Sequence, residues 1–394
     1  MYIIRDVTDN LARLASQYPV VTITGPRQSG KTTLCKKVFP KMPYVSLERV
    51  ENRKHAGEDP LDFLNQYPDG VIIDEIQRTP DLTSYIQELV DEKNREGMFI
   101  LTGSHQFELI DTINQSLAGR TALVKLLPFS FNELYGHSRK PALEKLLYTG
   151  FYPRIFDKKL DPSEASSFYI NTYIERDLRN LINIRDLSKF ENFLKFCAAR
   201  TGQILNVSGL ANDCGINSKT ADNWLSILEA SYIITRLKPH YRNFNKRLIK
   251  SPKLYFWDTG LASFLLNITS VDHIRNHPLK GYLFETFIVT ELLKQKFNSI
   301  KTSNFYFWRD NIGNEVDLIL DYADKQRPVE IKSGKTISTD FFKGTQYYQK
   351  LNTAAYQPVV VYGGDKNIVM DNTRIISYKL IHRLKEFVKP ASLE

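Results

Sequence analysis

The fold of this chain is decided by Val20-Val-Thr-Ile-Thr-Gly-Pro-Arg-Gln-Ser-Gly-Lys-Thr32. The first four residues of this stretch are apolar or β-branched, which predicts a short buried strand. The turn that follows matches the pattern G-x-x-x-x-G-K-[ST] at every position, with Gly25, Gly30, Lys31 and Thr32 as its fixed residues. The sequence therefore predicts a phosphate-binding loop between a strand and a helix.

The residue types in this loop suit a nucleoside triphosphate. Glycines at the two ends let the backbone wrap a phosphate chain with its N–H groups pointing inward, at the positive end of the next helix. We expect Lys31 to reach the β- and γ-phosphates and the Thr32 hydroxyl to hold Mg²⁺. The predicted contacts to ATP are Gly25, Pro26, Arg27, Gln28, Ser29, Gly30, Lys31, Thr32 and Thr33. The alternative, a glycine turn with a solvated lysine, does not account for the preceding strand.

A second pattern, Gly70-Val-Ile-Ile-Asp-Glu75, is a β-branched run that ends in two adjacent carboxylates. This Walker B pattern predicts that Asp74 binds Mg²⁺ through water and that Glu75 polarises the water that attacks the γ-phosphate. Taken alone, the run fits a buried strand with a solvated acidic turn equally well. Its position about forty residues after the loop favours the catalytic interpretation.

Two further positions are candidates for contact with the γ-phosphate. The predicted strand 98–101 ends in Thr102-Gly-Ser104, and we assign the sensing role to Ser104, with Thr102 as the second choice. Helix capping by Ser104 is the alternative interpretation. Arg120 stands in the loop before another strand, where an arginine finger would act on the nucleotide of its own chain or of a neighbouring subunit. The sequence leaves these two possibilities open.

The middle of the chain changes character. Three short helices are predicted at 193–199, 207–213 and 218–231, with a tight turn at Gly215 between the last two. Two helices joined by a glycine turn, followed by β-branched residues and a basic loop, are typical of a winged helix-turn-helix. The segment 230–257 contains no Asp or Glu and seven basic residues, which are Arg236, Lys238, Arg242, Lys246, Arg247, Lys250 and Lys253.

A basic wing of this kind would neutralise DNA phosphates. The expected recognition helix carries Lys219, Asp222 and Asn223, which offer few groups for reading bases. We therefore expect DNA binding without sequence specificity. Winged helices also dock on proteins, so a protein partner is the alternative.

The C-terminal third places charged residues on a helix and two strands. Glu285 stands near the start of an apolar helix, Asp317 in a later strand, and Glu330-Ile-Lys332 near the end of the next strand. This order resembles the PD-(D/E)xK nuclease superfamily. The resemblance implies that Asp317 and Glu330 hold Mg²⁺ and that Lys332 positions or activates the attacking water. Glu285 would support the site from the helix.

Composition limits the remaining possibilities. The chain has 394 residues, of which 42% are hydrophobic and 25% charged, so we expect a globular protein of two to four domains. No apolar run reaches membrane-spanning length and the N-terminus is charged, which favours a cytoplasmic protein. The net charge of +9 permits nucleic-acid binding without proving it. The cysteines Cys35, Cys197 and Cys214 lack metal-site spacing, and we expect reduced thiols.

A family resemblance joins these patterns. The segments that carry it are Gly25-Pro-Arg-Gln-Ser-Gly-Lys-Thr-Thr-Leu34, Ile73-Asp-Glu-Ile-Gln-Arg78, Leu101-Thr-Gly-Ser104, Leu117-Ala-Gly-Arg120 and Leu127-Pro-Phe-Ser-Phe-Asn-Glu-Leu134. They resemble a large family of prokaryotic AAA-type ATPases with a C-terminal domain of unknown function that has nuclease-like character. The resemblance implies the fold and the use of ATP, and it makes an oligomer compatible with the sequence.

The predicted fold class is α/β, in four parts. We expect a P-loop AAA-type ATPase core at 1–136, a helical lid at 137–187, a winged helix at 188–268 and a nuclease-like α/β domain at 269–394. The predicted function is Mg²⁺-dependent ATP hydrolysis that repositions the last two domains on DNA. The alternatives are a nucleotide-gated switch that binds a protein, and an active metal-dependent DNA nuclease.

Overall fold

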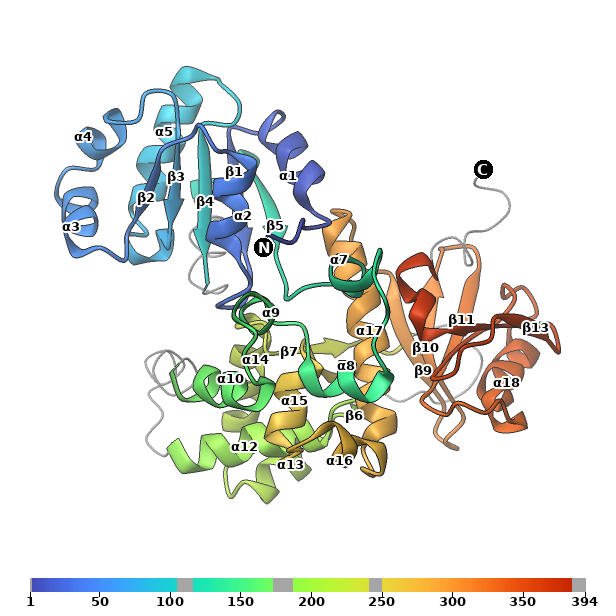
Figure 1. Cartoon of the computed structure of the whole chain (residues 1–394). Helices are drawn as coiled ribbons and strands as arrows, with labels where there is room; N and C mark the ends of the chain where they lie inside the picture. The colour runs from blue at the N-terminus through green and yellow to red at the C-terminus, as the bar shows by residue number, and fades with distance from the viewer. Residues whose placement is uncertain (1, 105–115, 173–186, 241–249, 385–394) are drawn as a thin grey trace. The chain divides into compact units, whose positions relative to one another are not determined.

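The computed structural model describes residues 2–104, 116–172, 187–240 and 250–384 (Figure 1). The chain falls into two compact units. Unit 1 consists of Met1–Phe129, Ala230–Tyr232 and Lys296–Lys301, and unit 2 consists of Ser130–Glu229, Ile233–Gln295 and Thr302–Glu394. Two short segments from later in the sequence thus belong to the N-terminal unit.

Unit 1 is built around a five-stranded sheet with the order β2-β3-β4-β1-β5, in which every pair of neighbours is parallel (Figure 1). The strands are β1 (Val20–Thr24), β2 (Tyr44–Ser46), β3 (Val71–Asp74), β4 (Phe99–Gly103) and β5 (Thr121–Lys125). The helices are α1 (Thr8–Ala15), α2 (Lys31–Val38), α3 (Val50–Glu58), α4 (Pro60–Asn65) and α5 (Leu82–Lys93), with a 3-10 turn η1 (Ile76–Arg78) after β3. This mixed α/β core with a parallel sheet fits a P-loop ATPase.

Helices cover both faces of this sheet because its strands are apolar on both sides. Val71 and Ile73 of β3 pack into one core cluster with α3, α4 and α5. Ile72 points the other way and packs with α1 and α2 in a second cluster. Successive side chains of a strand alternate between faces, so a continuous apolar strand needs cover on both.

The first part of unit 2 is mainly helical. Its elements are α7 (Phe131–Tyr135), α8 (Leu143–Thr149), α9 (Pro153–Lys158), α10 (Pro162–Tyr169), α12 (Leu187–Ala199), β6 (Gln203–Ile204), α13 (Val207–Asp213), α14 (Ser218–Ala230), β7 (Ile234–Leu237), β8 (Lys253–Phe256), α15 (Thr259–Leu265) and α16 (Val271–Arg275). The strands form an antiparallel sheet with the order β6-β8-β7, so β8 is central.

The second part of unit 2 is a six-stranded mixed sheet with the order β13-β14-β12-β11-β10-β9. Its elements are α17 (Lys280–Asn298), β9 (Phe305–Arg309), β10 (Glu315–Asp321), β11 (Gln326–Lys332), η3 (Thr339–Phe341), α18 (Lys343–Leu351), β12 (Val359–Tyr362), β13 (Ile368–Met370), β14 (Thr373–Ser377) and η4 (Tyr378–Arg383). The β9, β10 and β11 strands are antiparallel, whereas β11, β12 and β14 are parallel.

The N-terminal segment of unit 1 ends at Phe129, before the predicted boundary at residue 136. The reason is the packing of α7. The ring of the buried Phe131 lies 5.9 Å from the ring of Phe287 on α17 and 5.9 Å from that of His382 on η4, so this helix belongs to unit 2.

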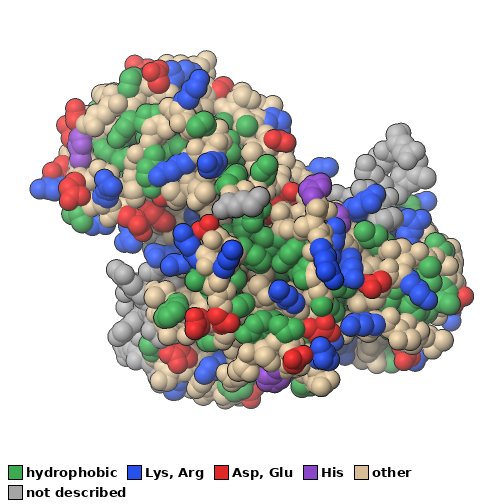
Figure 2. Space-filling model, in the orientation of Figure 1, with side chains coloured by type: hydrophobic (Ala, Val, Ile, Leu, Met, Phe, Trp, Pro, Cys, Tyr) green, Lys and Arg blue, Asp and Glu red, His purple; other side chains and the backbone are tan. Residues whose placement is uncertain are grey.

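The surface and the thiols add two observations. On the face drawn in Figure 2, lysine and arginine side chains are interspersed with acidic ones, so the net charge of +9 is not gathered into one patch there. The three cysteines are buried and unpaired with one another.

Within the described ranges, no helix has the length and apolar character needed to cross a membrane.

Gly70 provides a test of this fold. Its φ is +105°, and a Cβ there would overlap the carbonyl oxygen of Met98, which accepts the Val71 N–H at 2.9 Å. We expect Gly70→Ala to destabilise unit 1 by about 1–3 kcal/mol in thermal melts, because alanine is strained in this conformation. The control is Gly57→Ala within α3, where a Cβ meets nothing within 4 Å and should stabilise the helix slightly. A Gly70→Ala variant that melts with the wild type would contradict this account.

Candidate functional site

The phosphate-binding loop joins β1 to α2 at the carboxyl edge of the parallel sheet. Gln28 has φ of +60° and Gly30 has φ of +92°, so the loop uses left-handed backbone at two positions. A Cβ on Gly25 would overlap the carbonyl oxygen of Leu126, which restricts this position to glycine. Of the other predicted contacts, Arg27 is half-buried, and Gln28 and Thr33 are exposed.

Lys31 points into the loop from the start of α2. Its buried ammonium donates to the carbonyl oxygens of Gly25 at 2.9 Å and Pro26 at 3.0 Å. Burial lowers the pKa of Lys31, and the carboxylates of Glu75 and Asp74 oppose that effect. Among the described residues, the buried hydroxyl of Ser29 has no hydrogen-bond partner. A phosphate oxygen would accept from both groups, so the loop fits the predicted nucleotide.

Asp74 is the centre of a hydrogen-bond network at the end of β3. Its Oδ2 accepts from the Thr32 hydroxyl at 2.9 Å and from the Tyr44 hydroxyl at 2.7 Å. Its Oδ1 accepts from the Thr102 hydroxyl. The structure thus brings together Thr32 and Asp74, which the sequence predicts to hold Mg²⁺. A hydroxyl and a carboxylate side by side suit an ion whose other ligands are phosphate oxygens and water.

Sequence reasoning missed Tyr44. This residue lies on β2, and β2 is the neighbour of β3 in the sheet. Burial, followed by the hydrogen bond to Asp74, raises the pKa of Tyr44, which keeps its hydroxyl a donor. A tyrosine in a short strand usually belongs to a core, so the sequence held no signal for this contact.

Glu75 follows Asp74 in a left-handed conformation, with φ of +60° and ψ of +48°. Such strain in a residue other than glycine costs about 1–3 kcal/mol and is concentrated at functional sites. The Glu75 carboxylate accepts from the Ser104 hydroxyl at 3.1 Å and from the Gln77 amide. Ser104 therefore meets the carboxylate predicted to activate water. The alternative of helix capping by Ser104 concerns residues 105–115, which lie outside the described residues.

Arg120 lies at the opposite edge of the sheet. Its backbone carbonyl accepts from Val20 N, at the start of β1, whereas the loop follows the other end of that strand. Four residues of strand span about 13 Å. The guanidinium forms a two-point ion pair with Asp91 at 2.5 and 2.6 Å. Within its own chain, Arg120 therefore lies away from the loop, because parallel strands all begin at the edge opposite the loop. Action on a neighbouring subunit stays a prediction.

Arg5 supports the loop from the N-terminal segment, to which the sequence assigned no role. Its buried guanidinium donates to the Ser29 carbonyl at 2.8 Å and to the Leu127 carbonyl at 2.6 Å. It also lies over the Phe129 ring, 4.8 Å from the centroid. The sequence held no signal for this role, because Arg5 stands beside Asp6 in a charged N-terminal segment.

The predicted basic wing is only partly available to DNA. Arg236 pairs with Glu229 at 2.7 Å and with Asp222 at 3.6 Å. Lys253 is buried, whereas Lys238 and Lys250 are exposed. The three other predicted residues, Arg242, Lys246 and Arg247, lie outside the described residues. Carboxylates therefore already engage Arg236 and Lys253, and Lys253 is too deeply buried to reach DNA. DNA contact by the rest of the basic segment stays a prediction.

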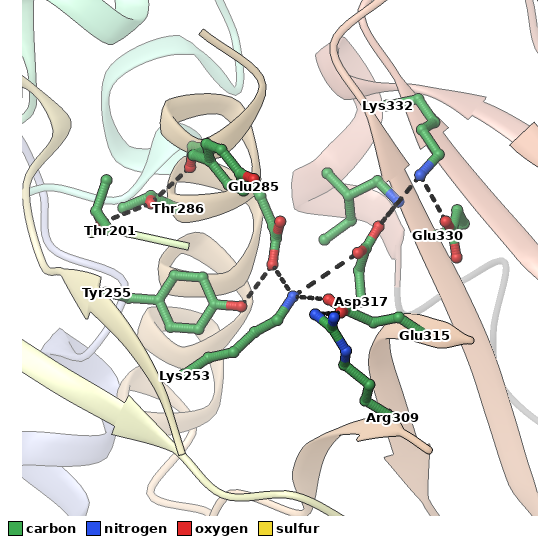
Figure 3. Close-up of polar contacts among 12 residues, drawn as sticks. Thr201, Lys253, Tyr255, Glu285, Thr286, Arg309, Glu315, Asp317, Glu330 and Lys332 are labelled. Atoms are coloured by element: carbon green, nitrogen blue, oxygen red, sulfur yellow. Dashed lines mark hydrogen bonds and ion pairs between the residues drawn. The ribbon is translucent and has the colours of Figure 1, made fainter. Parts of the chain in front are cut away.

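The second predicted site, in unit 2, also comes together (Figure 3). Asp317 on β10 accepts from the Ile331 N–H at 2.8 Å, and Lys332 lies 3.9 Å from its carboxylate. The same Lys332 ammonium pairs with Glu330 at 2.5 Å. Glu285 reaches the group from α17, as expected. The structure thus brings these residues of the helix and the two strands together.

Lys253 is the member that sequence reasoning misassigned. It comes from β8, and its ammonium lies 2.7 Å from Glu285, pairs with Glu315 and lies 3.9 Å from Asp317 (Figure 3). Burial alone would lower the pKa of Lys253, but the surrounding carboxylates, Glu285 first, raise it well above its usual value. The lysine therefore stays charged.

Burial and the neighbouring cations change the pKa values of the carboxylates in this group. Burial raises the pKa of Glu285 to about 7 and that of Glu330 to about 8, against the opposing effect of the neighbouring lysines. Glu315 behaves differently: burial would raise its pKa, but Lys253 and Arg309 hold it below its usual value. Arg309 pairs with Glu315 at 2.8 Å.

A divalent metal, which the nuclease resemblance implies, does not fit this arrangement. Ammonium groups already engage each carboxylate of the predicted set: Lys253 for Glu285, Lys332 for Glu330, and both at 3.9 Å for Asp317. No group of three or more His, Cys, Asp or Glu residues in the described parts of the chain is placed to hold a metal ion. The predicted Mg²⁺ role of Asp317 and Glu330 is thus not supported by their surroundings.

The fold and the phosphate-binding site define a P-loop AAA-type ATPase. Residues 17–135 match the family described as an AAA domain. Residues 140–272 and 280–381 match two families described as domains of unknown function, DUF8612 and DUF4143.

Curated relatives place the chain more closely. It is 31% identical over 338 residues to the uncharacterized protein Rv2008c of Mycobacterium tuberculosis, covering 85% of this chain and 75% of the relative. The uncharacterized protein Mb2031c of Mycobacterium bovis matches to the same extent. The chain belongs to the family of these proteins.

Solved structures give more distant matches. The Walker-type ATPase PABY2304 of Pyrococcus abyssi is 15% identical, with a TM-score of 0.45 over 67% of this chain and 96% of that one. The STAND protein PH0952 of Pyrococcus horikoshii is 14% identical, with a TM-score of 0.21 over 76% and 50%. Matches at this level do not bear on activity.

Tyr44 provides a test of the site. We expect Tyr44→Phe to raise the Mg²⁺ concentration for half-maximal ATP hydrolysis about five- to tenfold, because Asp74 loses one of its orienting hydrogen bonds. Rates measured across a Mg²⁺ series check this. Tyr85→Phe is the control, since that ring packs in the same unit against the core of β3 and β4. An unchanged Mg²⁺ requirement in Tyr44→Phe would remove the hydroxyl from the site.

Proposed function

We propose that this AAA-type protein binds ATP with Mg²⁺ at residues 25–33 and hydrolyses it with Glu75 as the base. Its nucleotide state then repositions a winged helix and the C-terminal domain on DNA. The observation that carries the proposal is the network in which Thr32 and Thr102 hold Asp74 while Ser104 holds Glu75.

Each group of this network has a part in the proposed reaction. Mg²⁺, held by Thr32 and through water by Asp74, would neutralise charge on the β- and γ-phosphates. The Lys31 ammonium would bind the same phosphates. Glu75 would accept a proton from the attacking water. Its backbone strain and its bond to Ser104 fix the carboxylate, and that bond would change when a γ-phosphate is present.

The DNA part of the proposal rests on unit 2. The proposal of a winged helix, with the β7–β8 hairpin as its wing, is supported by the element order α12, β6, α13, α14, β7, β8 and by the strand order β6-β8-β7. The turn between α13 and α14 contains Gly215, with φ of +62°. Exposed Lys219 on α14, with Lys238 and Lys250 at the hairpin, would contact DNA phosphates. We keep the proposed limits of this domain at 188–268.

Tyr232 offers a connection between the two activities. Its hydroxyl lies 2.6 Å from the hydroxyl of Thr24, the last residue of β1 before the phosphate-binding loop. Tyr232 is buried and left-handed, with φ of +56°. Residues 230–232 belong to unit 1, whereas most of α14 before them and β7 after them belong to unit 2. A shift of β1 on hydrolysis would therefore reach the winged helix through one short piece of chain.

The remaining predictions on domain limits and assembly are retained as proposals. The limits 1–136, 137–187 and 269–394 for the core, lid and C-terminal domain remain proposals, as does an oligomer in which Arg120 acts on a neighbour. A nucleotide-gated switch for a protein partner is the competing function. We do not favour a nuclease, because ammonium groups engage the carboxylates that cutting would require.

The first experiment compares ATP hydrolysis by the wild type and by Glu75→Gln, with and without double-stranded DNA. We expect Glu75→Gln to bind ATP normally and to lose turnover by at least about 100-fold, because the water loses its base. The control is Glu88→Gln, a neutralised exposed carboxylate of the same unit. Near-normal turnover in Glu75→Gln would remove it from the mechanism. A wild-type rate indifferent to DNA would favour the protein-binding switch.

Tyr232→Phe tests the connection. We expect basal hydrolysis within twofold of the wild type, roughly, and DNA stimulation reduced at least about threefold, because one buried hydrogen bond is lost. Tyr18→Phe, a half-buried tyrosine of the same unit, is the control. Equal stimulation in the wild type and Tyr232→Phe would show that the coupling runs elsewhere.

A further inference from the structure

The ammonium of Lys253 is buried, in an environment that disfavours a charged group. Its side chain is 2% exposed, and it stands on the central strand of the three-stranded sheet. A buried ammonium without partners is strongly unfavourable, so its surroundings must supply negative charge and hydrogen bonds. Glu285 and Glu315 do this directly, from α17 and β10.

The carboxylates around Lys253 are those that the nuclease resemblance assigns to a metal. Glu285 also accepts from the Tyr255 hydroxyl at 2.6 Å, and Tyr255 lies two residues after Lys253 on β8 (Figure 3). The hairpin strand therefore contributes two donors to one acidic group. A divalent cation and an ammonium cannot share these oxygen atoms without mutual repulsion.

The same hairpin continues along the edge of the six-stranded sheet. After β7, the His240 N–H donates to the Phe307 carbonyl at 2.7 Å, and the Phe307 N–H donates to the Lys238 carbonyl at 3.2 Å. The His240 ring lies 3.2 Å from Asp321 at the end of β10. The backbone of residues 238–240 thus pairs with the edge of β9 that does not face β10, next to the contact between His240 and Asp321.

We propose that the Lys253 ammonium replaces the metal ion of a nuclease-like centre and locks the β7–β8 hairpin to α17 and β10. The C-terminal domain then serves as a fixed support for the wing, and it does not cut DNA. The inference goes beyond the proposed function and does not depend on ATP hydrolysis, because every residue in it lies in unit 2.

The test measures Mn²⁺ binding to the full-length, nucleotide-free protein by electron paramagnetic resonance. We expect the wild type and Asp317→Asn to bind equal amounts, because no metal enters this centre. Lys253→Met should bind one additional Mn²⁺, which the double variant Lys253→Met/Asp317→Asn should lose. Lys366→Met, which removes an exposed lysine of the same unit, should bind as much Mn²⁺ as the wild type.

Two outcomes would overturn the proposal. One is Mn²⁺ bound by the wild type and lost in Asp317→Asn, which would show that metal enters beside Lys253. The other is a folded Lys253→Met that gains no Mn²⁺. Neither depends on ATPase activity, so failure here is separate from failure of the proposed function.

A melting experiment covers the case in which Lys253→Met folds poorly. We expect this variant to lose about 5 °C or more in apparent melting temperature, because it leaves buried carboxylates without their cation. Adding Glu285→Gln to the same chain should recover part of the loss. A double variant that melts no higher than Lys253→Met would overturn the ionic lock.

Discussion

The parallel pairing of β1, β4 and β3 is the constraint on which the nucleotide site depends. Parallel strands end at one edge, so the loop after β1, Asp74 and Glu75 after β3 and Ser104 after β4 are brought together by backbone hydrogen bonds alone. The side chains then hold one another, with Asp74 bonded by three hydroxyls. The same constraint places Arg120 away from the loop of its own chain, because residues before a strand lie at the other edge.

The second centre depends on a different balance. Four carboxylates, Glu285, Glu315, Asp317 and Glu330, are gathered at the ends of a helix and two strands, and burial would make their charge costly. Two lysines and an arginine offset it. One of those lysines comes from a separate sheet, so the electrostatic balance of the C-terminal domain is completed by the hairpin. The residues that the pattern assigns to a metal site also form a contact between two parts of unit 2.

Helix α17 is part of the continuous chain that connects the second centre to unit 1. Its first two turns carry Glu285, which binds Lys253, whereas its last residues and the turn after it, 296–301, belong to unit 1. There the Asn298 carbonyl accepts from the Asn10 side chain at 2.9 Å, and the Phe297 ring lies 4.9 Å below the Lys125 ammonium. Residues 230–232 are one covalent connection between unit 1 and the hairpin. The end of α17 is a second one, between unit 1 and the C-terminal domain.

Sequence alone determined the local chemistry of this protein. Loop and strand motifs need specific residues at fixed intervals. The phosphate-binding loop is therefore predicted by the spacing of Gly25, Gly30, Lys31 and Thr32, and the end of the next motif's strand by the adjacent acids Asp74 and Glu75. It also indicated that Glu285, Asp317, Glu330 and Lys332 converge. Only the tertiary structure decided what lies beside them: Tyr44 on Asp74, Arg5 under the loop and Lys253 among the carboxylates. These partners come from distant segments, and a tyrosine, an arginine or a lysine carries no pattern that distinguishes a buried contact from a solvated one.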